Sequence, residues 1–103
     1  MWEQAERVFA QGLGIEPESL RLQINMASLS IDQGDYTEAI NRLEPVVDAY
    51  PESFAANYNM ALALLGEGTN LNRARDISLT LADNYPARRS QLTELMQKLG
   101  VEY

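Results

Sequence analysis

The chain of 103 residues contains no cysteine and no histidine, and its only lysine is Lys98. Without these side chains there are no disulfides, no thiolate nucleophile, no imidazole general base and no usual zinc ligand set. A lone lysine also leaves little scope for Schiff-base chemistry. The missing residue types therefore argue against an enzyme, and we expect no metal or cofactor. The lack of cysteine is compatible with the cytoplasm or with a bacterial periplasm.

Long apolar runs are also missing, and none approaches the roughly 18 consecutive apolar residues of a membrane span. We therefore expect no membrane insertion. The formal net charge is −7, and the excess of acid lies in residues 1–52, whereas acids and bases balance in residues 53–103. Because nucleic acids are bound through lysine and arginine, we expect no nucleic-acid partner. An apolar or cationic peptide is compatible with this charge.

Motifs of known chemistry are absent as well. The acidic residues of the first half do not have the spacing of a calcium loop, and no glycine-rich turn presents them together. The sequence contains no glycine-rich phosphate loop and no nucleophile elbow. A solvated helix face is the simpler interpretation of the acidic residues.

An internal repeat is the strongest feature of the sequence. Pro17 and Pro51 are 34 residues apart, and Pro86 follows after another 35. The tripeptide Asn-Met-Ala occurs at residues 25–27 and again, 34 positions later, at residues 59–61. The positions before the three prolines also correspond, and they are Ala5, Phe9 and Gly12, then Ala39, Leu43 and Val46, then Ala74, Ser78 and Leu81. A period in this range is typical of solenoid proteins.

Each repeat unit is predicted to contain two helices. Residues 54–67 are rich in alanine, leucine and methionine, with Ser53 as a suitable N-cap and Gly68 as a helix stop. Residues 37–50 place apolar side chains three or four positions apart, which predicts a second helix, with a kink at Pro45.

Residues 20–26 are ambiguous when taken alone. Leu20, Leu22, Ile24 and Met26 alternate with polar residues, a pattern typical of a strand. However, the 34-residue register aligns this segment with the helix predicted for residues 54–67. We therefore predict a helix here too.

Three runs carry a resemblance to a known family: Gln23–Ala27, Gln33–Ile40 and Asn57–Leu64. With the 34-residue spacing, they make the chain resemble the tetratricopeptide repeat (TPR) family. Methionines at 26 and 60 stand where the family usually has leucine, and Gln23 and Asn57 stand where it usually has tryptophan. The resemblance implies an all-α fold, a TPR-like right-handed α-solenoid with a concave side.

The repeat register predicts a single domain over residues 1–103 with about six antiparallel helices. Residues 1–17 would be the second helix of a partial repeat, 20–53 and 54–86 two full repeats, and 87–103 a capping helix. In that order Trp2, Val8 and Phe9 lack a covering helix. We therefore expect either a fragment of a larger protein or a homo-oligomer joined through the N-terminal helix.

The family resemblance also implies a function, the non-catalytic binding of a protein or peptide in the concave groove lined by the first helix of each repeat. Asn25 and Asn59 occupy matching positions from which an amide can bond a peptide backbone, and Tyr58 is an aromatic anchor candidate. The expected groove residues are Arg21, Ile24, Asn25, Ser28, Asp32, Tyr58, Asn59, Leu62 and Leu65. Family members that grip a C-terminal carboxylate use lysine and arginine at set positions of these helices. The matching positions here are Ile24, Ser28, Tyr58 and Leu62, and Arg21 is the only cation nearby, so we do not expect such a carboxylate clamp. A structural spacer or a dimerisation module is the alternative function.

Overall fold

The computed structural model describes residues 18–100, which form five α-helices and one short 3₁₀ helix, without any strand in this range. The elements are α2 (Glu18–Asp32), α3 (Tyr36–Ala49), α4 (Phe54–Glu67), α5 (Leu71–Asn84), η1 (Pro86–Arg88) and α6 (Arg89–Lys98). The all-α prediction is confirmed. So is the helix over residues 20–26, because α2 contains the whole alternating segment. The expected helix within residues 1–17 lies outside the described residues.

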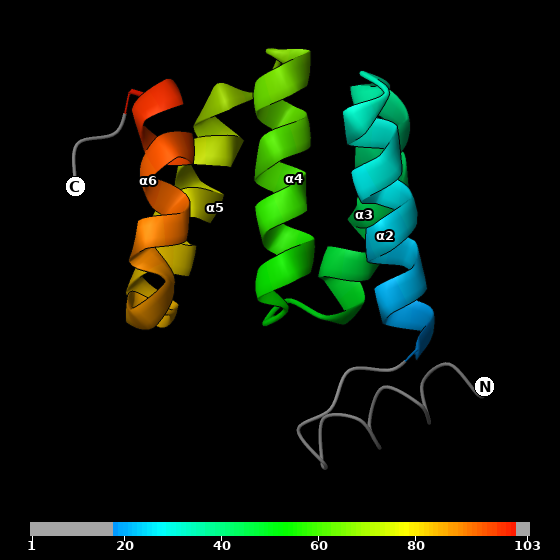
Figure 1. Cartoon of the computed structure of the whole chain (residues 1–103), viewed down its shortest axis with the longest axis horizontal. Coiled ribbons are helices and arrows are strands. Elements are labelled where there is room, and N and C mark those ends of the chain that lie inside the picture. The colour runs from blue at the N-terminus through cyan, green and yellow to red at the C-terminus, as the bar shows by residue number, and fades with distance from the viewer. Residues whose placement is uncertain (1–17, 101–103) are drawn as a thin grey trace.

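The helices stack in two layers (Figure 1). Each helix packs against the next one in the chain, and α2 also packs against α4. In the view of Figure 1, α2, α4 and α6 lie in the nearer layer, and α3 and α5 lie behind them. We call the side of the molecule formed by α2, α4 and α6 the inner face, and the side formed by α3 and α5 the outer face. The fold is thus a helical repeat in which the first helix of each unit lies in one layer and the second helix lies in the other.

Side chains at the helix starts satisfy the free backbone N–H groups there. The N-caps of α3, α4 and α5 are Asp35, Ser53 and Asn70, and each side chain accepts a hydrogen bond from the backbone N–H three residues later. Ser53 therefore caps α4 as predicted. Gly68, with φ of 78°, ends the same helix in the left-handed conformation, also as predicted. α3 continues through Pro45 to Ala49.

Small residues stand where the helices approach most closely. Ala27, Ala39, Ala61 and Ala74 have no exposed surface, and each lies in the main core cluster. Larger apolar side chains fill the space beside them, and the fully buried ones are Leu43, Met60, Leu92 and Leu99. Burying each of these contributes roughly 1.5–3 kcal/mol to the free energy of unfolding. The core therefore joins α2, α3, α4, α5 and α6.

In the described part of the chain, no helix combines the length and the apolar character that crossing a bilayer requires.

Candidate functional site

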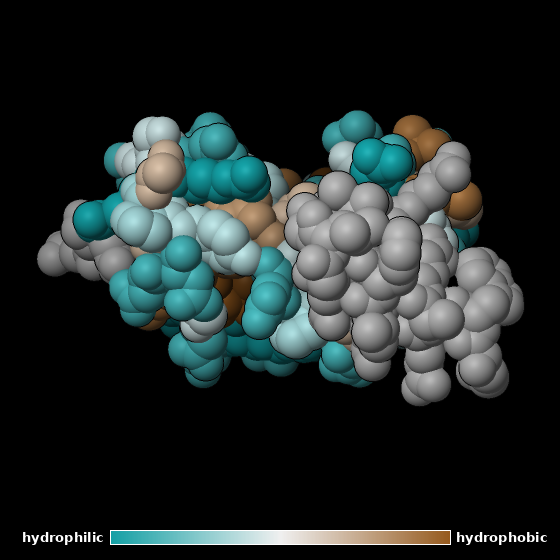
Figure 2. Space-filling view, turned by 90° about the horizontal axis from the view of Figure 1, so that it is seen from below, coloured by the Kyte–Doolittle hydropathy of each residue, from teal (hydrophilic) through white to brown (hydrophobic). Residues whose placement is uncertain are grey.

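The inner face is hollowed near the middle of the molecule. Figure 2 views the molecule from below, with the inner face along its upper edge, and shows a notch in that edge between the two ends. α2 and α4, which carry all the predicted groove residues, lie side by side in the inner layer. The structure therefore places both predicted groups of residues on neighbouring helices.

On α4, the predicted residues Tyr58, Leu62 and Leu65 are half-buried. They follow one another at intervals of four and three residues, so they share one side of the helix. All three pack partly against the main core cluster. Tyr58 also stacks on the ring of Phe54, with 5.8 Å between ring centroids and 12° between ring planes. This stacking restrains the Tyr58 ring while part of it stays accessible.

Asn59, the fourth predicted residue of α4, is half-buried and bonded within its own helix. Its Nδ2 donates to the carbonyl oxygen of Ala55 at 2.9 Å. This bond uses one amide hydrogen, which leaves the second hydrogen and the side-chain oxygen for a further contact.

On α2, the predicted residues differ in how far they are exposed. Arg21, Asn25 and Asp32 are exposed, and Ser28 is half-buried. The prediction for Ile24 is wrong, because its side chain is only 6% exposed. Ile24 belongs to a small core cluster with Leu20, Val46 and Ala56, residues drawn from α2, α3 and α4. Ile24 is buried where α2 packs against α3 and α4, so it is part of the core and is not available to a partner.

A second side of α2 carries exposed apolar side chains. Leu22, Met26 and Leu29 are 56%, 36% and 57% exposed. The equivalent positions of α4, 34 residues later, are Ala56, Met60 and Ala63, all with no exposed surface. On α4 these positions are covered by neighbouring helices, whereas on α2 the described residues leave them open. The expected partner helix within residues 1–17, with Trp2, Val8 and Phe9, lies outside the described residues.

An aromatic cluster joins the start of α4 to the end of α5. The buried ring of Phe54 meets the ring of Tyr85 edge-on, with 5.4 Å between centroids and 78° between planes. The guanidinium carbon of Arg88 lies 4.7 Å from the centroid of the same ring, within cation–π range. The Tyr-Pro pairs at residues 50–51 and 85–86 mark the position of such a junction in the sequence. Which rings meet there is decided by the packing.

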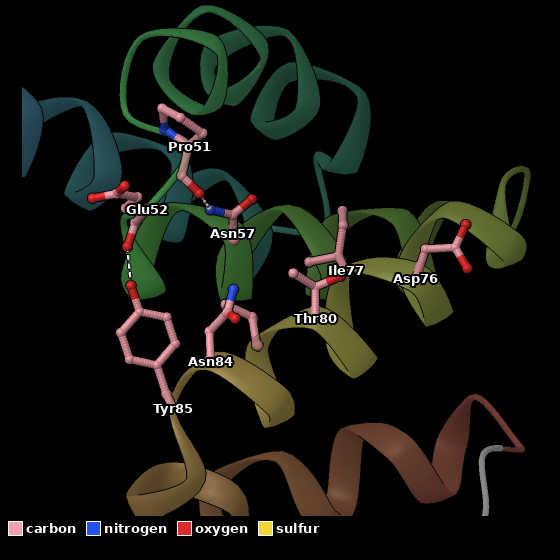
Figure 3. Close-up of a pocket in the computed structure, with 9 residues that line it drawn as sticks. Pro51, Glu52, Asn57, Asp76, Ile77, Thr80, Asn84 and Tyr85 are labelled. Atoms are coloured by element: carbon pink, nitrogen blue, oxygen red, sulfur yellow. Dashed lines mark hydrogen bonds between the residues drawn. The ribbon is translucent and has the colours of Figure 1, made fainter.

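A cleft of about 510 Å³, which we call the outer cleft, opens between α5, the first half of α4 and the segment that joins α3 to α4 (Figure 3). It is lined by Pro51, Glu52, Asn57, Asp76, Ile77, Thr80, Leu81, Asn84 and Tyr85. None of these residues is predicted as a binding residue from the sequence. One sequence feature could have pointed to this cleft: Asn57 stands at a position where the resembled family usually has tryptophan.

Two contacts near this cleft connect α5, or the residue after it, to α3 or the segment after it. Arg73 of α5 pairs with Glu44 of α3 at 2.5 Å. The hydroxyl of Tyr85 donates to the backbone oxygen of Glu52. The hydrogen bond from Arg73 to Glu44, together with the nearby charges of Glu44 and Asp48, raises the pKa of the Arg73 guanidinium. Arg73 is therefore a permanent cation already engaged by carboxylates.

No cluster that could hold a metal ion occurs in residues 18–100, taking histidine, cysteine, aspartate and glutamate side chains in groups of three or more.

Comparison with known proteins identifies the chain as a member of a repeat family. Residues 30–99 match the family model described as tetratricopeptide repeat. No curated protein and no solved structure matches the chain at a significant level. Repeats of this family in general mediate protein–protein interactions and are not catalytic. Because the match spans more than half of the chain and agrees with the helical structure, this protein belongs to the tetratricopeptide repeat family.

Proposed function

We propose that this protein binds an extended or helical segment of a partner protein on its inner face. The observation that carries the proposal is the row formed by Tyr58, Leu62 and Leu65, half-buried apolar side chains on one side of α4. The exposed polar residues of α2, Arg21 and Asn25, lie on the neighbouring helix. An apolar centre beside a polar rim is the usual anatomy of a protein interface.

The packing behind this row supports its use as an anchor. Tyr58 is restrained by stacking on Phe54, and Leu62 and Leu65 rest on the core. A restrained side chain loses little conformational entropy when a partner binds, so more of the contact energy appears as affinity. Aromatic side chains are also enriched among the residues that dominate binding energy. We therefore assign Tyr58 the largest share of the affinity.

The polar predicted residues would hold the backbone and the ends of the bound segment. Asn25 and Asn59 stand at equivalent positions of the two repeats and offer amide donors and acceptors. Ser28 and Asp32 extend the polar rim along α2. With a net charge of −7, the protein favours a neutral or cationic segment over an acidic one.

Selection of random peptides on the immobilised protein, followed by titration of a selected peptide, tests this proposal. The double variant Tyr58→Ala, Asn59→Ala should weaken binding about tenfold or more, in the range of interface hot spots. The control is Asn41→Ala, which removes an exposed side chain from α3 in the outer layer and should leave the dissociation constant unchanged. Equal binding by the wild type and the Tyr58→Ala, Asn59→Ala variant contradicts the inner face as the binding site.

A second candidate function, self-association, is favoured by the exposed apolar side of α2. Leu22, Met26 and Leu29 together present an apolar surface of the kind that mediates contacts between proteins. We propose that a second copy of the chain covers this surface of α2, and that the contact between the copies also includes the N-terminal residues Trp2, Val8 and Phe9. As a dimerisation module, the protein would act as a structural connector.

Sedimentation over a range of concentrations tests self-association. The wild type should show a concentration-dependent dimer, and the double variant Leu22→Gln, Leu29→Gln should shift it toward monomer. A wild type that stays monomeric at all concentrations overturns this second candidate without affecting the first.

A further inference from the structure

We propose that the outer cleft is a separate binding site for an extended, basic segment of a partner protein. The cleft lies between α5, the first half of α4 and the segment that joins α3 to α4 (Figure 3), and none of its lining residues is a predicted residue of the inner face. The proposal therefore adds a second surface, with its own ligand chemistry, to the function proposed above.

The cleft has a cause in the sequence. Asn57 stands where the family usually has tryptophan, and its side chain is folded back toward the end of α3. Its Nδ2 donates to the carbonyl oxygens of Pro51 at 3.1 Å and of Ser53 at 2.8 Å. The short side chain leaves unfilled the space that an indole would occupy beside α5.

The shape of the cleft is held by contacts across it. The Arg73–Glu44 ion pair lies one helical turn before Ile77 on α5, and the Tyr85–Glu52 hydrogen bond lies at the far end. The ring of Tyr85 is further held against Phe54. Because the Tyr85–Glu52 contact joins two lining residues and the Arg73–Glu44 pair fixes α5 against α3 beyond the lining, the cleft is largely preformed, and little energy is spent on ordering it when a ligand binds.

The lining offers hydrogen-bonding groups over an apolar floor. Ile77 and Leu81 supply the floor, with Leu81 buried and Ile77 half-buried. Because both hydrogens of Asn57 Nδ2 are donated to carbonyls, its Oδ1 is left to accept a hydrogen bond from a ligand. The exposed amide of Asn84 points toward Asn57 in Figure 3 and forms no hydrogen bond within residues 18–100. A peptide backbone supplies the donors and acceptors that these two amides need.

The acidic side chains of the cleft favour a positively charged ligand. Figure 3 shows Glu52 and Asp76 at opposite ends of the lining, and both are exposed. Within residues 18–100, no lysine or arginine lines the cleft. The nearby Arg73 is paired with Glu44 and lies close to Asp48, and Arg88 lies on the Phe54 ring that Tyr85 also contacts. The acidic character therefore comes from the two carboxylates of the lining itself. Lysine or arginine side chains of a bound segment would meet these carboxylates.

The dimensions suit a short extended segment. From Asp76 to Tyr85, α5 advances about 13 Å at 1.5 Å per residue. An extended chain covers that length with about four residues. A segment with a basic residue near each end and an apolar residue between them would match the two carboxylates and the floor.

The experiment uses a blocked peptide of about six residues, with lysine at each end and alanine and leucine between, titrated into the ¹⁵N-labelled protein. We expect NMR shift changes at the side-chain amides of Asn57 and Asn84 and at the backbone amides of Ile77 and Thr80. Signals of the inner face, such as Tyr58 and Leu62, should not move. A peptide with glutamate in place of lysine should not bind.

Variants with matched controls separate the cleft from non-specific charge attraction. Asn57→Trp should fill the cleft and abolish binding, whereas Gln23→Trp, the same change at the equivalent position of α2, should not. Asp76→Asn should weaken binding about two- to fivefold, the range expected for an exposed ion pair. Glu94→Gln, which removes an equal charge from α6, should have no effect.

Three results would overturn the proposal: shift changes confined to the inner face, equal binding of the glutamate peptide, or equal effects of Asp76→Asn and Glu94→Gln. If Asn57→Trp does not fold, the variants Asp76→Asn and Glu94→Gln and the lysine and glutamate peptides still test the proposal. Shifts at Tyr58 and Leu62 would instead support the inner face as the basic-peptide site. Failure of the outer cleft is therefore distinguishable from failure of the function proposed for the inner face.

Discussion

The ring of Tyr36, at the start of α3, lies against the backbone of Gly66 near the end of α4 and occupies the space that a side chain at position 66 would need. A Cβ atom built on Gly66 would overlap three atoms of the ring. The φ angles of Gly34, Gly68 and Gly100 are positive, but that of Gly66 is not. Gly66 is therefore required by the close approach of Tyr36 and not by its backbone conformation.

Replacing Gly66 with alanine tests this relationship. The substitution adds up to about 1 kcal/mol of helix propensity, but it displaces the Tyr36 ring, and we expect a net loss of about 1 kcal/mol in the free energy of unfolding. In a Tyr36→Ala background the same Gly66→Ala change should be stabilising, because the overlap is gone. Urea denaturation of the four proteins measures this coupling. Stabilisation by Gly66→Ala in both backgrounds contradicts the explanation.

The two equivalent methionines should respond differently to truncation. Met60 has no exposed surface, whereas Met26, 34 residues earlier, is 36% exposed. Met60→Ala should lower the free energy of unfolding by about 2–3 kcal/mol through the lost burial and the cavity left behind. Met26→Ala should cost less than about 1 kcal/mol. Thermal or urea unfolding compares them, and an equal cost at both sites would show that the apolar side of α2 is covered in solution.

Ser53→Ala should remove the N-cap of α4. The hydroxyl oxygen of Ser53 accepts from the backbone N–H of Ala56 at 3.2 Å. Loss of such a cap typically costs about 1 kcal/mol, whereas Ser53→Asp should retain most of the stability. Ser90→Ala, in the exposed first turn of α6 where no side-chain cap is present, is the control and should change stability little. Equal unfolding midpoints for Ser53→Ala and the wild type would argue against the cap.

Glu67 should titrate at a lower pH than an ordinary glutamate. Its carboxylate accepts hydrogen bonds from Thr69 Oγ1 at 2.5 Å and Thr37 Oγ1 at 2.8 Å, and both lower the pKa of Glu67. Because the pKa is lower in the folded state than in the unfolded state, the carboxylate stabilises the fold at neutral pH. That contribution is lost as the pH falls from the ordinary glutamate range through the lowered pKa.

Carboxyl ¹³C NMR titration of Glu67 measures the shift directly. Thr37→Val and Thr69→Val should each raise the pKa of Glu67 toward its usual value, with the larger change for Thr69→Val, whose hydroxyl causes the larger shift. A pKa of Glu67 that is unchanged in both variants rules out these hydroxyls as the cause.

The repeat and its helices were predictable because they depend on local chemistry. Capping by Ser53 and termination at Gly68 require only neighbouring backbone groups, and both are confirmed. The helix over residues 20–26 was predictable only through the repeat, since its own alternation favours a strand. Its equivalence to α4 outweighed that pattern, and α2 confirms it.

The site was less predictable because it depends on contacts between helices distant in the sequence. Tyr58 and Leu62 are partly accessible, as the predicted groove requires. Ile24, at the position equivalent to Tyr58, is instead buried by Val46 and Ala56. The outer cleft is lined by residues of α4, of α5 with Tyr85, and of the segment that joins α3 to α4. No single stretch of sequence contains all of these.

The sequence by itself thus determined the repeat period, the helices and the absence of the side chains used in most catalysis, because each follows from residue type and spacing. The tertiary structure decided which equivalent positions are covered. Ala63 is enclosed while Leu29 is open, because burial depends on which neighbouring helix lies over a position. It also decided that the space beside Asn57 becomes a cleft, because a void exists only once the surrounding helices are in place.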